Sequence, residues 1–267
     1  MSQRIQSNAM TQVKRADAAK EKASARLASG QQINRASEGA AELSATSSLK
    51  SAARATSAAL SNASRGVALG QIADGAMSQI QDLLLRMKEL AVSSASDTFG
   101  DNDRTAANTE LQTLSTAIND IAARTRYSGK VLLDGSAGQL DIQTGEDSAD
   151  LTSFTPANVQ SSALSVDGLD ISSKSGAVSA QATIDAAITT LASARSDVGA
   201  FMVGLESTIS VNQLKSENLD AAISVFAEAD LAKEATNLAM ADIKSQMAQA
   251  MITKENQAAA NITGLVR

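Results

Sequence analysis

The chain lacks histidine, cysteine and tryptophan, and its 267 residues include only four Phe, one Tyr and one Pro. Without cysteine there is no disulfide, no thiolate nucleophile and no zinc–thiolate centre. Without histidine there is no imidazole base, no Ser-His-Asp relay and none of the commonest metal ligand. No cluster in the sequence supplies a base and a nucleophile together. We therefore expect a protein that is not an enzyme and that holds no cofactor and no metal.

Charge and hydropathy exclude two further kinds of partner. The chain has 23 basic and 29 acidic residues and a net charge of −6, whereas a protein that binds a phosphate backbone needs a basic stripe. No stretch approaches the ~18 apolar residues of a membrane span. Residues 1–20 contain no apolar block like the core of a secretory signal. We expect no nucleic acid, no membrane insertion, and a chain that is cytoplasmic or exported without a cleaved signal peptide.

The composition instead favours long helices. Alanine supplies about a fifth of the chain, well above its average usage, and it is the strongest helix former. Between Gly39 and Ala95 there is no proline, and apolar residues recur at alternating steps of four and three, as in helices that pack lengthwise. These residues are Leu69, Ala73, Ala76, Ile80, Leu83, Met87 and Leu90. The helix would be about 80 Å long, with a break or kink expected near Gly66, Gly70 and Gly75.

A second helix is predicted after a turn in the Ser93–Asp103 stretch. Asp101 and Asp103 are the candidates for its N-terminal cap, and it would end near Arg126. Its apolar stripe is Leu111, Leu114, Ile118 and Ile121. The spacing predicts that this helix packs against the first one.

The middle of the chain loses the helical period. Residues 131–133 and 140–142 predict the two strands of a small β-hairpin joined by a short turn. Residues 145–177 are rich in Ser, Asp, Thr and Gly, which predicts a polar, irregular insert with one short strand around 164–171.

Helical periodicity resumes at Ile184 and continues in steps of four and three to Asn212. Arg195 and Asn212 interrupt this stripe with polar side chains, which we expect to fix the register between helices. A last helix is predicted over residues 218–256. It carries one more apolar stripe, which consists of Met240, Ile243, Met247 and Met251.

The fold class is therefore mainly α: an elongated helical bundle or coiled-coil rod with a small β-hairpin region and a short polar insert. Both chain ends would meet at one end of the bundle. Their helices carry too little apolar surface to offset the entropy of ordering alone, and exposed apolar flanks indicate an interaction surface. Unlike patches that meet without closing a ring produce an open helical filament. The alternative is two frayed helices that finish an ordinary bundle.

If the ends do assemble, the contacts should come from their larger apolar side chains. We predict the following polymerisation contacts: Ile5, Val13, Leu27, Leu231, Leu238, Ile243, Met247, Met251 and Leu265. The partner would then be further copies of the same chain.

Five segments resemble sequence signatures of bacterial flagellins. Residues 26–36, RLASGQQINRA, resemble RLSSG-x-x-IN-x-A, and residues 84–92, LLRMKELAV, are similar to LQRVRELAV. Residues 127–133, YSGKVLL, look like FNGVKVL. Residues 229–232, ADLA, resemble the start of ADFATE, and the last residues, 265–267, resemble LLR. The segments occur in the family's order, so the chain is identified as similar to flagellin.

The resemblance implies a structural subunit of the extracellular flagellar filament, exported unfolded through the flagellum's own channel and polymerised at the tip for motility. It implies an inner terminal-helix domain (1–38 with 218–267), a rod-like domain that includes the β-hairpin (39–145 with 178–217), and a short variable insert (146–177). The implied partners are further copies, an export chaperone, and the cap and hook-associated proteins.

Three residues of the rod match positions through which the mammalian Toll-like receptor for flagellin grips this family. They are Arg86, Leu90 and Glu110, and the resemblance implies a candidate receptor patch. We expect their native role to be structural, because Leu90 continues the apolar stripe and Arg86 with Glu110 can form an ordinary ion pair.

Two alternative functions fit part of the pattern. A hook–filament junction protein shares the terminal helices and rod, but it more often carries a proline-bearing PSDDP after the Ser-Gly signature, where this chain has ASEGA at 36–40. A signalling coiled coil would also be rich in Ala, Ser and Gln, but it would lack the β-hairpin. One departure from flagellins is AISVF at 222–226, where many have ARSRI, and it predicts altered subunit packing.

Overall fold

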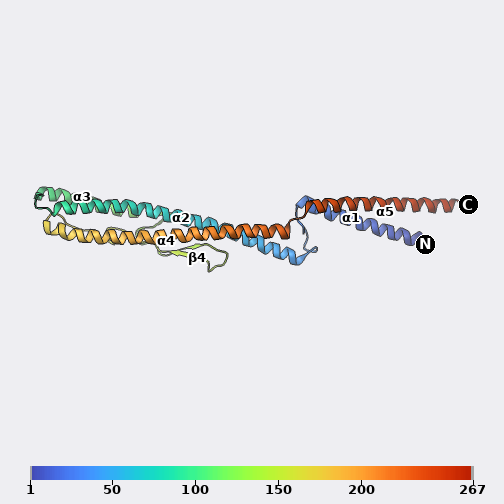
Figure 1. The fold of residues 1–267 in the computed structure, drawn as a ribbon, viewed down its shortest axis with the longest axis horizontal. Coiled ribbons are helices and arrows are strands. Elements are labelled where there is room, and N and C mark those ends of the chain that lie inside the picture. The colour runs from blue at the N-terminus through green and yellow to red at the C-terminus, as the bar shows by residue number, and fades with distance from the viewer. Residues whose placement is uncertain (1, 266–267) are drawn as a thin grey trace. The chain divides into compact units, whose positions relative to one another are not determined.

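The computed structural model describes residues 2–265, and the side-chain surroundings of residues 7–258 and 260. Its helices are α1 (Ser2–Ser29), α2 (Ala40–Ser94), α3 (Asp101–Arg124), α4 (Lys174–Ala227) and α5 (Leu231–Leu265). Its strands are β1 (Arg126–Tyr127), β2 (Lys130–Val131), β3 (Leu140–Gln143) and β4 (Leu151–Phe154). The mainly α fold class with a small β region is confirmed (Figure 1).

The chain divides into two compact units. The terminal unit consists of residues 1–53 and 217–267, and the central unit consists of residues 54–216. In the terminal unit α1 and α5 lie side by side, and in the central unit α2 is flanked by α3 and α4 (Figure 1). Both units are therefore made chiefly of helices that pack lengthwise, as the steps of four and three predicted.

The central unit has a continuous apolar core between α2, α3, α4 and the strands. The predicted stripes supply part of it, because they place large side chains on the inner face of each helix. In α2, however, Met77 and Leu84 are fully buried, whereas Ala76 and Leu83 of the predicted stripe are only half-buried. The largest fully buried side chains are Met77, Ile80, Leu84, Met87, Leu111, Ile118, Leu132, Leu133, Ile171, Ile184, Leu191 and Leu205.

Helix α2 runs unbroken for 55 residues, so the predicted break near its glycines was wrong. A Cβ atom on Gly66 would lie 2.5 Å from Ile142 Cδ1 and 2.7 Å from Leu205 Cδ1, and one on Gly70 would lie 2.6 Å from Met202 Cγ. These two glycines let neighbouring side chains approach the α2 backbone. Their cost in helix propensity is offset by the contact that they allow.

The turn between α2 and α3 is held by backbone and side-chain hydrogen bonds. Gly100 is the N-cap of α3, and its N–H donates to Asp103 Oδ2 over 3.3 Å. The prediction that Asp101 or Asp103 is the cap was therefore wrong, because Asp103 lies at the third helical position and reaches back. Arg104 Nε and Nη2 donate to the carbonyls of Ser94 and Ser96 over 2.9 and 2.7 Å, which satisfies the C-terminal end of α2.

The strand pairing differs from the predicted hairpin. Strand β1 pairs with β2, and β3 pairs with β4 with Leu140 opposite Phe154, both antiparallel. Residues 131–133 and 140–142 therefore do not pair with each other. The left-handed backbone of Ser128 and Gly129 (φ 49° and 84°) closes the β1–β2 turn, and Leu132 and Leu133 continue into the core.

The segment after β4 contains no strand, so the strand predicted around residues 164–171 was wrong. Three side chains of α3 bind its backbone instead, and one of them is Gln112, whose Nε2 donates to the Leu169 carbonyl over 2.7 Å. Asn119 Oδ1 accepts from the Ser161 N–H over 2.9 Å, and Asn108 Oδ1 accepts from the Ile171 N–H over 3.0 Å. The segment is irregular but not wholly polar, because four of its apolar residues are buried, namely Val159, Leu164, Val166 and Ile171.

The boundary between the last two helices lies further along the chain than predicted. Helix α4 ends at Ala227 and α5 begins at Leu231. Asp230 caps α5, since its Oδ1 accepts from the N–H groups of Ala232 and Lys233 over 3.0 and 3.1 Å. Helix α4 continues past Asn212. This residue is buried, and its Nδ2 donates to the Thr144 carbonyl over 2.8 Å.

Arg195, the other polar interruption, binds α2 from α4. Its Nε donates to Asp74 Oδ1 over 2.8 Å and its Nη1 donates to Gln81 Oε1 over 2.6 Å. The bond to Asp74 raises the pKa of the arginine. The two polar residues of the stripe thus tie α4 to α2 and to the strand region, as a register-fixing role requires.

Candidate functional site

Helices α1 and α5 form an antiparallel pair that joins the two ends of the chain. Asp17 Oδ1 accepts from Ser245 Oγ over 2.9 Å, and Lys20 Nζ lies 2.6 Å from Asp242 Oδ1. The bond to Asp242 raises the pKa of Lys20. These cross-links fix which turn of α1 faces which turn of α5.

The contact between α1 and α5 is made by small side chains. Among the residues whose side chains are described, the buried ones of α1 are Ala9, Ala16 and Ala23, and those of α5 are Glu234, Ala241 and Ser245. The alanines of α1 are seven residues apart, so they lie on one face of the helix. Small residues let the two backbones approach closely, but they bury little apolar area.

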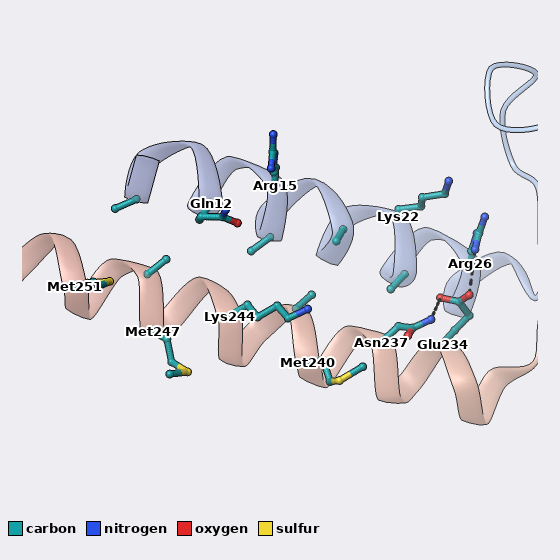
Figure 2. A pocket seen from close by; sticks show the side chains of 16 residues that line it. Gln12, Arg15, Lys22, Arg26, Glu234, Asn237, Met240, Lys244, Met247 and Met251 are labelled. Atoms are coloured by element: carbon teal, nitrogen blue, oxygen red, sulfur yellow. Dashed lines mark hydrogen bonds and ion pairs between the residues drawn. The ribbon is translucent and has the colours of Figure 1, made fainter. Parts of the chain in front are cut away.

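An ion pair closes this contact near the end of α1. Arg26 Nη1 lies 3.0 Å from Glu234 Oε1, and Glu234 Oε2 also accepts from Asn237 Nδ2 over 3.3 Å. Figure 2 shows both interactions, the first between the facing helices and the second within α5. Because Glu234 is buried, this pair depends on precise alignment of α1 and α5.

The same region brings together two of the segments with flagellin-like sequence. The Gly30 carbonyl accepts from the Ala229 N–H over 2.9 Å, and the Gln32 N–H donates to the Ala227 carbonyl over 2.8 Å. Gly30 has a left-handed backbone, with φ +66°. The turn after α1 is thereby fastened to the short link between α4 and α5.

The predicted polymerisation residues fall into two groups. Val13, Leu27 and Leu238 are half-buried, whereas Leu231, Ile243, Met247 and Met251 are exposed. The side chains of Ile5 and Leu265 lie outside the described residues. None of the seven described residues is fully covered by the α1–α5 contact itself.

The stripe predicted on α5 points to solvent. The exposed fractions of Met240, Ile243, Met247 and Met251 are 48, 56, 68 and 60%. Steps of three and four place them on one face of the helix. Figure 2 shows Met247 directed away from α1. We call these four residues the α5 stripe.

A groove of about 770 Å³ runs along the α1–α5 pair. Alanines of both helices line it, and Arg15, Lys22 and Lys244 give it a basic rim. Figure 2 shows these side chains together with the methionines of α5. A surface with apolar and basic parts is suited to binding helices.

The residues of the candidate receptor patch also lie together. Arg86 Nε is 2.8 Å from Glu110 Oε1, and its Nη1 is 3.0 Å from Glu89 Oε2. These two carboxylates raise the pKa of Arg86. Leu90 is only 8% exposed and belongs to the core of the central unit. A groove between α2 and α3 is lined by Arg86, Leu90 and Glu110.

The sequence argument missed the small-residue face and the Arg26–Glu234 pair. The repeat of Ala9, Ala16 and Ala23 was a usable signal, because seven-residue spacing marks one helix face even when its residues are small. Arg26 and Glu234 both lie in or beside flagellin-like segments, but nothing in the sequence shows that they meet.

Two other kinds of site are absent from the described part of the chain. None of the helices there combines the length and the apolarity needed to cross a membrane. Within the same residues, no three acidic side chains are grouped so that they could hold a metal ion.

The fold and these surfaces define a helical structural protein whose two ends pair and leave apolar side chains uncovered. Residues 2–138 match the bacterial flagellin N-terminal helical region, and residues 181–266 match the bacterial flagellin C-terminal helical region. The chain belongs to the bacterial flagellin family. It is a self-assembling subunit of the extracellular flagellar filament, and the alternative of a junction protein is not favoured.

Relatives match over nearly the whole chain. Flagellin of Halalkalibacterium halodurans is 34% identical over 249 residues, which cover 92% of both proteins. Flagellin of Bacillus subtilis is 29% identical and is covered to 97%, as is this chain. The flagellar filament 33 kDa core protein of Treponema phagedenis is 29% identical over 261 residues, with 91% of this chain and 90% of that protein covered.

A solved structure shares the fold. The crystal structure of Bacillus cereus flagellin superposes with a TM-score of 0.52 at 24% identity, and covers 57% of this chain and 88% of that one.

Proposed function

We propose that this flagellin polymerises through its terminal unit. The inner domain of the filament then consists of residues 1–38 and 218–267, residues 39–145 with 178–217 form the rod, and residues 146–177 form the short variable insert. The supporting observation is that the α5 stripe is exposed while the α1–α5 contact buries alanines. Neighbouring copies of α1 and α5 would cover the stripe and complete the core.

The apolar area involved is large enough to drive assembly. Complete burial of one Leu, Ile or Met side chain contributes about 1.5–3 kcal/mol. The four residues of the α5 stripe are each about half exposed, so covering them contributes on the order of 4 kcal/mol per subunit. Val13, Leu27 and Leu238, which are half-buried, add to this term, and Ile5 and Leu265 belong to the same proposal by sequence.

A charge placed in the stripe tests the proposal. Met247→Asp should raise the critical concentration for polymerisation at least tenfold, measured by sedimentation and electron microscopy of purified protein under mild precipitant. Gln246→Asp is the matched control, because residue 246 is exposed on the same helix but lies outside the stripe. Equal polymerisation of both variants and the wild type would refute the role of the stripe.

The proposal extends to proteins that handle the subunit before assembly. An uncovered stripe in a free subunit needs protection, and we assign this to a flagellar export chaperone. The cap and hook-associated proteins would contact the same terminal helices at the ends of the filament. Co-purification of the chaperone with wild-type chain, and its loss with Met247→Asp but not Gln246→Asp, is the expected result.

Export is proposed to follow the flagellum's own channel, with no catalytic role for the chain. The lack of cysteine supports this route, because an unfolded chain in transit cannot then form disulfides. Mass spectrometry should find the same N-terminal peptide in protein from filaments and in protein retained in the cell. Cleavage after an N-terminal leader would contradict this route.

The groove lined by Arg86, Leu90 and Glu110 is proposed to have a structural role in the filament and, second to that, a role in receptor recognition. Leu90 is buried, so Leu90→Asp should impair both the central unit and binding to the mammalian Toll-like receptor for flagellin. Glu110→Ala leaves the core intact and should reduce receptor activation alone, measured with a reporter cell line. Normal assembly of Leu90→Asp would contradict the structural role.

A further inference from the structure

Helix α2 has one glycine that the packing of the chain does not explain. An added Cβ atom would meet other side chains at Gly66 and Gly70, but it would meet nothing within 4 Å at Gly75. Gly75 is exposed in the interior of a long helix, where glycine weakens the helix relative to almost any other residue. The subunit alone gains nothing from glycine here.

Gly75 lies in a groove between α2 and α3 in the central unit. The groove measures about 660 Å³. Ala76, Ala117 and Ile121 line it and are half-buried, and Ile72 is 42% exposed. Asp120, Arg124 and Arg126 also line it, and Arg124 Nη2 lies 3.6 Å from Asp120 Oδ2. The groove therefore combines small residues and apolar side chains with Arg126, a cation whose charge is not paired by Asp120.

The outer face of α4 carries a ridge of exposed apolar side chains. Val203, Val211 and Leu214 are 66, 61 and 62% exposed. With Ser207 they follow one another at steps of four, four and three, which places them on one face. Buried Leu205 and Asn212 lie on the opposite face. The ridge spans about 16 Å and the groove about 12 Å along its helix, at ~1.5 Å per residue.

The charges of ridge and groove are also complementary. Glu206 is the one charged residue between positions 200 and 214, and it lies at the edge of the ridge beside Val203. Among the described residues, neither Glu206 nor Arg126 takes part in an ion pair within 4.0 Å. Opposite charges at the ends of two apolar surfaces favour docking in one orientation.

We propose that the α4 ridge of one subunit docks in the groove around Gly75 of a second copy, with Gly75 allowing close approach. A second copy is the occupant because filament subunits are surrounded by other copies, and because both surfaces belong to this chain, have comparable lengths and carry opposite charges. The two surfaces differ, so the contact is heterologous and propagates from subunit to subunit. This interface lies in the central unit and is separate from the proposed contacts of the terminal helices.

Cross-linking tests the contact directly, because the natural chain has no cysteine. Filaments of Gly75→Cys/Val211→Cys treated with a short bis-maleimide should give a ladder of covalent multimers on a denaturing gel. Gly75→Cys/Val178→Cys is the matched control, since Val178 is exposed on α4 outside the ridge. Absence of a ladder, or equal ladders from both pairs, overturns the proposal. Should Gly75→Cys prevent assembly, Gln71→Cys on the groove rim replaces it.

Filling the groove gives a second test that does not depend on cross-linking. Gly75→Gln should leave the helix content and thermal midpoint of the monomer unchanged or raise the midpoint, yet increase the critical concentration at least tenfold. Gly75→Ala adds one methyl group and should assemble nearly as wild type does. If Gly75→Gln assembles normally while Met247→Asp does not, this inference fails and the proposal for the terminal helices stands.

Discussion

The terminal and central units are built from the same kind of helix but are held together in different ways. Among the described residues, every fully buried large side chain lies in the central unit, whereas the buried apolar residues of the terminal unit are Ala9, Ala16, Ala23 and Ala241. One unit thus encloses a core of its own, and the other relies on close backbone approach and polar pairs. A subunit built in this way can fold before assembly and still reserve part of its stability for the polymer.

The largest expected effect comes from opening the central core. Ile118 is fully buried, so Ile118→Ala should destabilise the free subunit by about 2–5 kcal/mol, measured by urea unfolding followed by circular dichroism. Ile243→Ala removes the same atoms from the exposed α5 stripe and should change this value by less than about 0.5 kcal/mol. A similar loss of stability in both variants would show that the two units are not stabilised in different ways.

The next effect is expected from enlarging a residue at the alanine contact. Ala241 is buried between α1 and α5, and Ala241→Leu should separate the two helices at a cost of about 1–3 kcal/mol. Faster amide exchange along α1 would report this change. Ala239→Leu is the control, because residue 239 is exposed on the same helix and should leave the exchange rates unchanged.

A smaller effect is expected from neutralising the buried carboxylate. Glu234→Gln leaves Arg26 without its counter-charge inside the contact and should weaken the α1–α5 pair by about 1–2 kcal/mol. Amide exchange in the last turns of α1 should rise accordingly. Glu21→Gln removes the carboxylate of an ion pair whose side chains are 73 and 74% exposed, and it should have almost no effect. Equal responses would mean that burial is not what gives Glu234 its role.

The smallest effect is a pH dependence that separates the two units. The bond from Lys174 lowers the pKa of Asp97 from 3.8, so its contribution to the central unit is lost as the pH falls below that value. The bond to Asp242 raises the pKa of Lys20 from 10.5, so its contribution to the terminal unit is lost as the pH rises above that value. Exchange measured at acid and alkaline pH should show opposite units loosening first, and Lys174→Ala should reduce the acid effect, part of which remains because the pKa values of Asp134, Asp141 and Asp170 are also lowered.

The sequence predicted the helices well where large apolar residues repeat. The stripes from Leu69 to Leu90 and from Ile184 to Leu205 lie on the helix faces that form the core, because hydrophobic periodicity indicates burial. Leu83 and Ile188 are nevertheless only half-buried, and Met77 and Leu84, which the stripe omitted, are fully buried. Sequence reasoning failed where the outcome depends on distant partners. Gly66 and Gly70 seemed to weaken α2 in isolation, and only the approach of Leu205 and Met202 from α4 explains them.

The candidate site was predicted only in part. The uncovered α5 stripe followed from its spacing, but the small contact that holds α1 to α5 carries almost no hydropathy signal. The irregular segment after β4 shows the same limit, because Asn108 and Asn119 of α3 bind its backbone. Such side-chain contacts over long sequence distances have no local pattern. The N-cap of α5 at Asp230 is of a common type, but it was missed because the helix was predicted to begin at residue 218.

The two asparagines on α3 also divide the middle of the chain into a fixed part and a part that is free to change. Residues 146–150, between β3 and β4, are exposed and lie ahead of both anchors. A peptide inserted among them would lengthen one surface turn while Phe154, Val159 and Ile171 kept their places in the core. This turn is therefore a point where the chain can accommodate a guest sequence at little cost to folding. In a polymer, the guest sequence would be displayed once on every subunit.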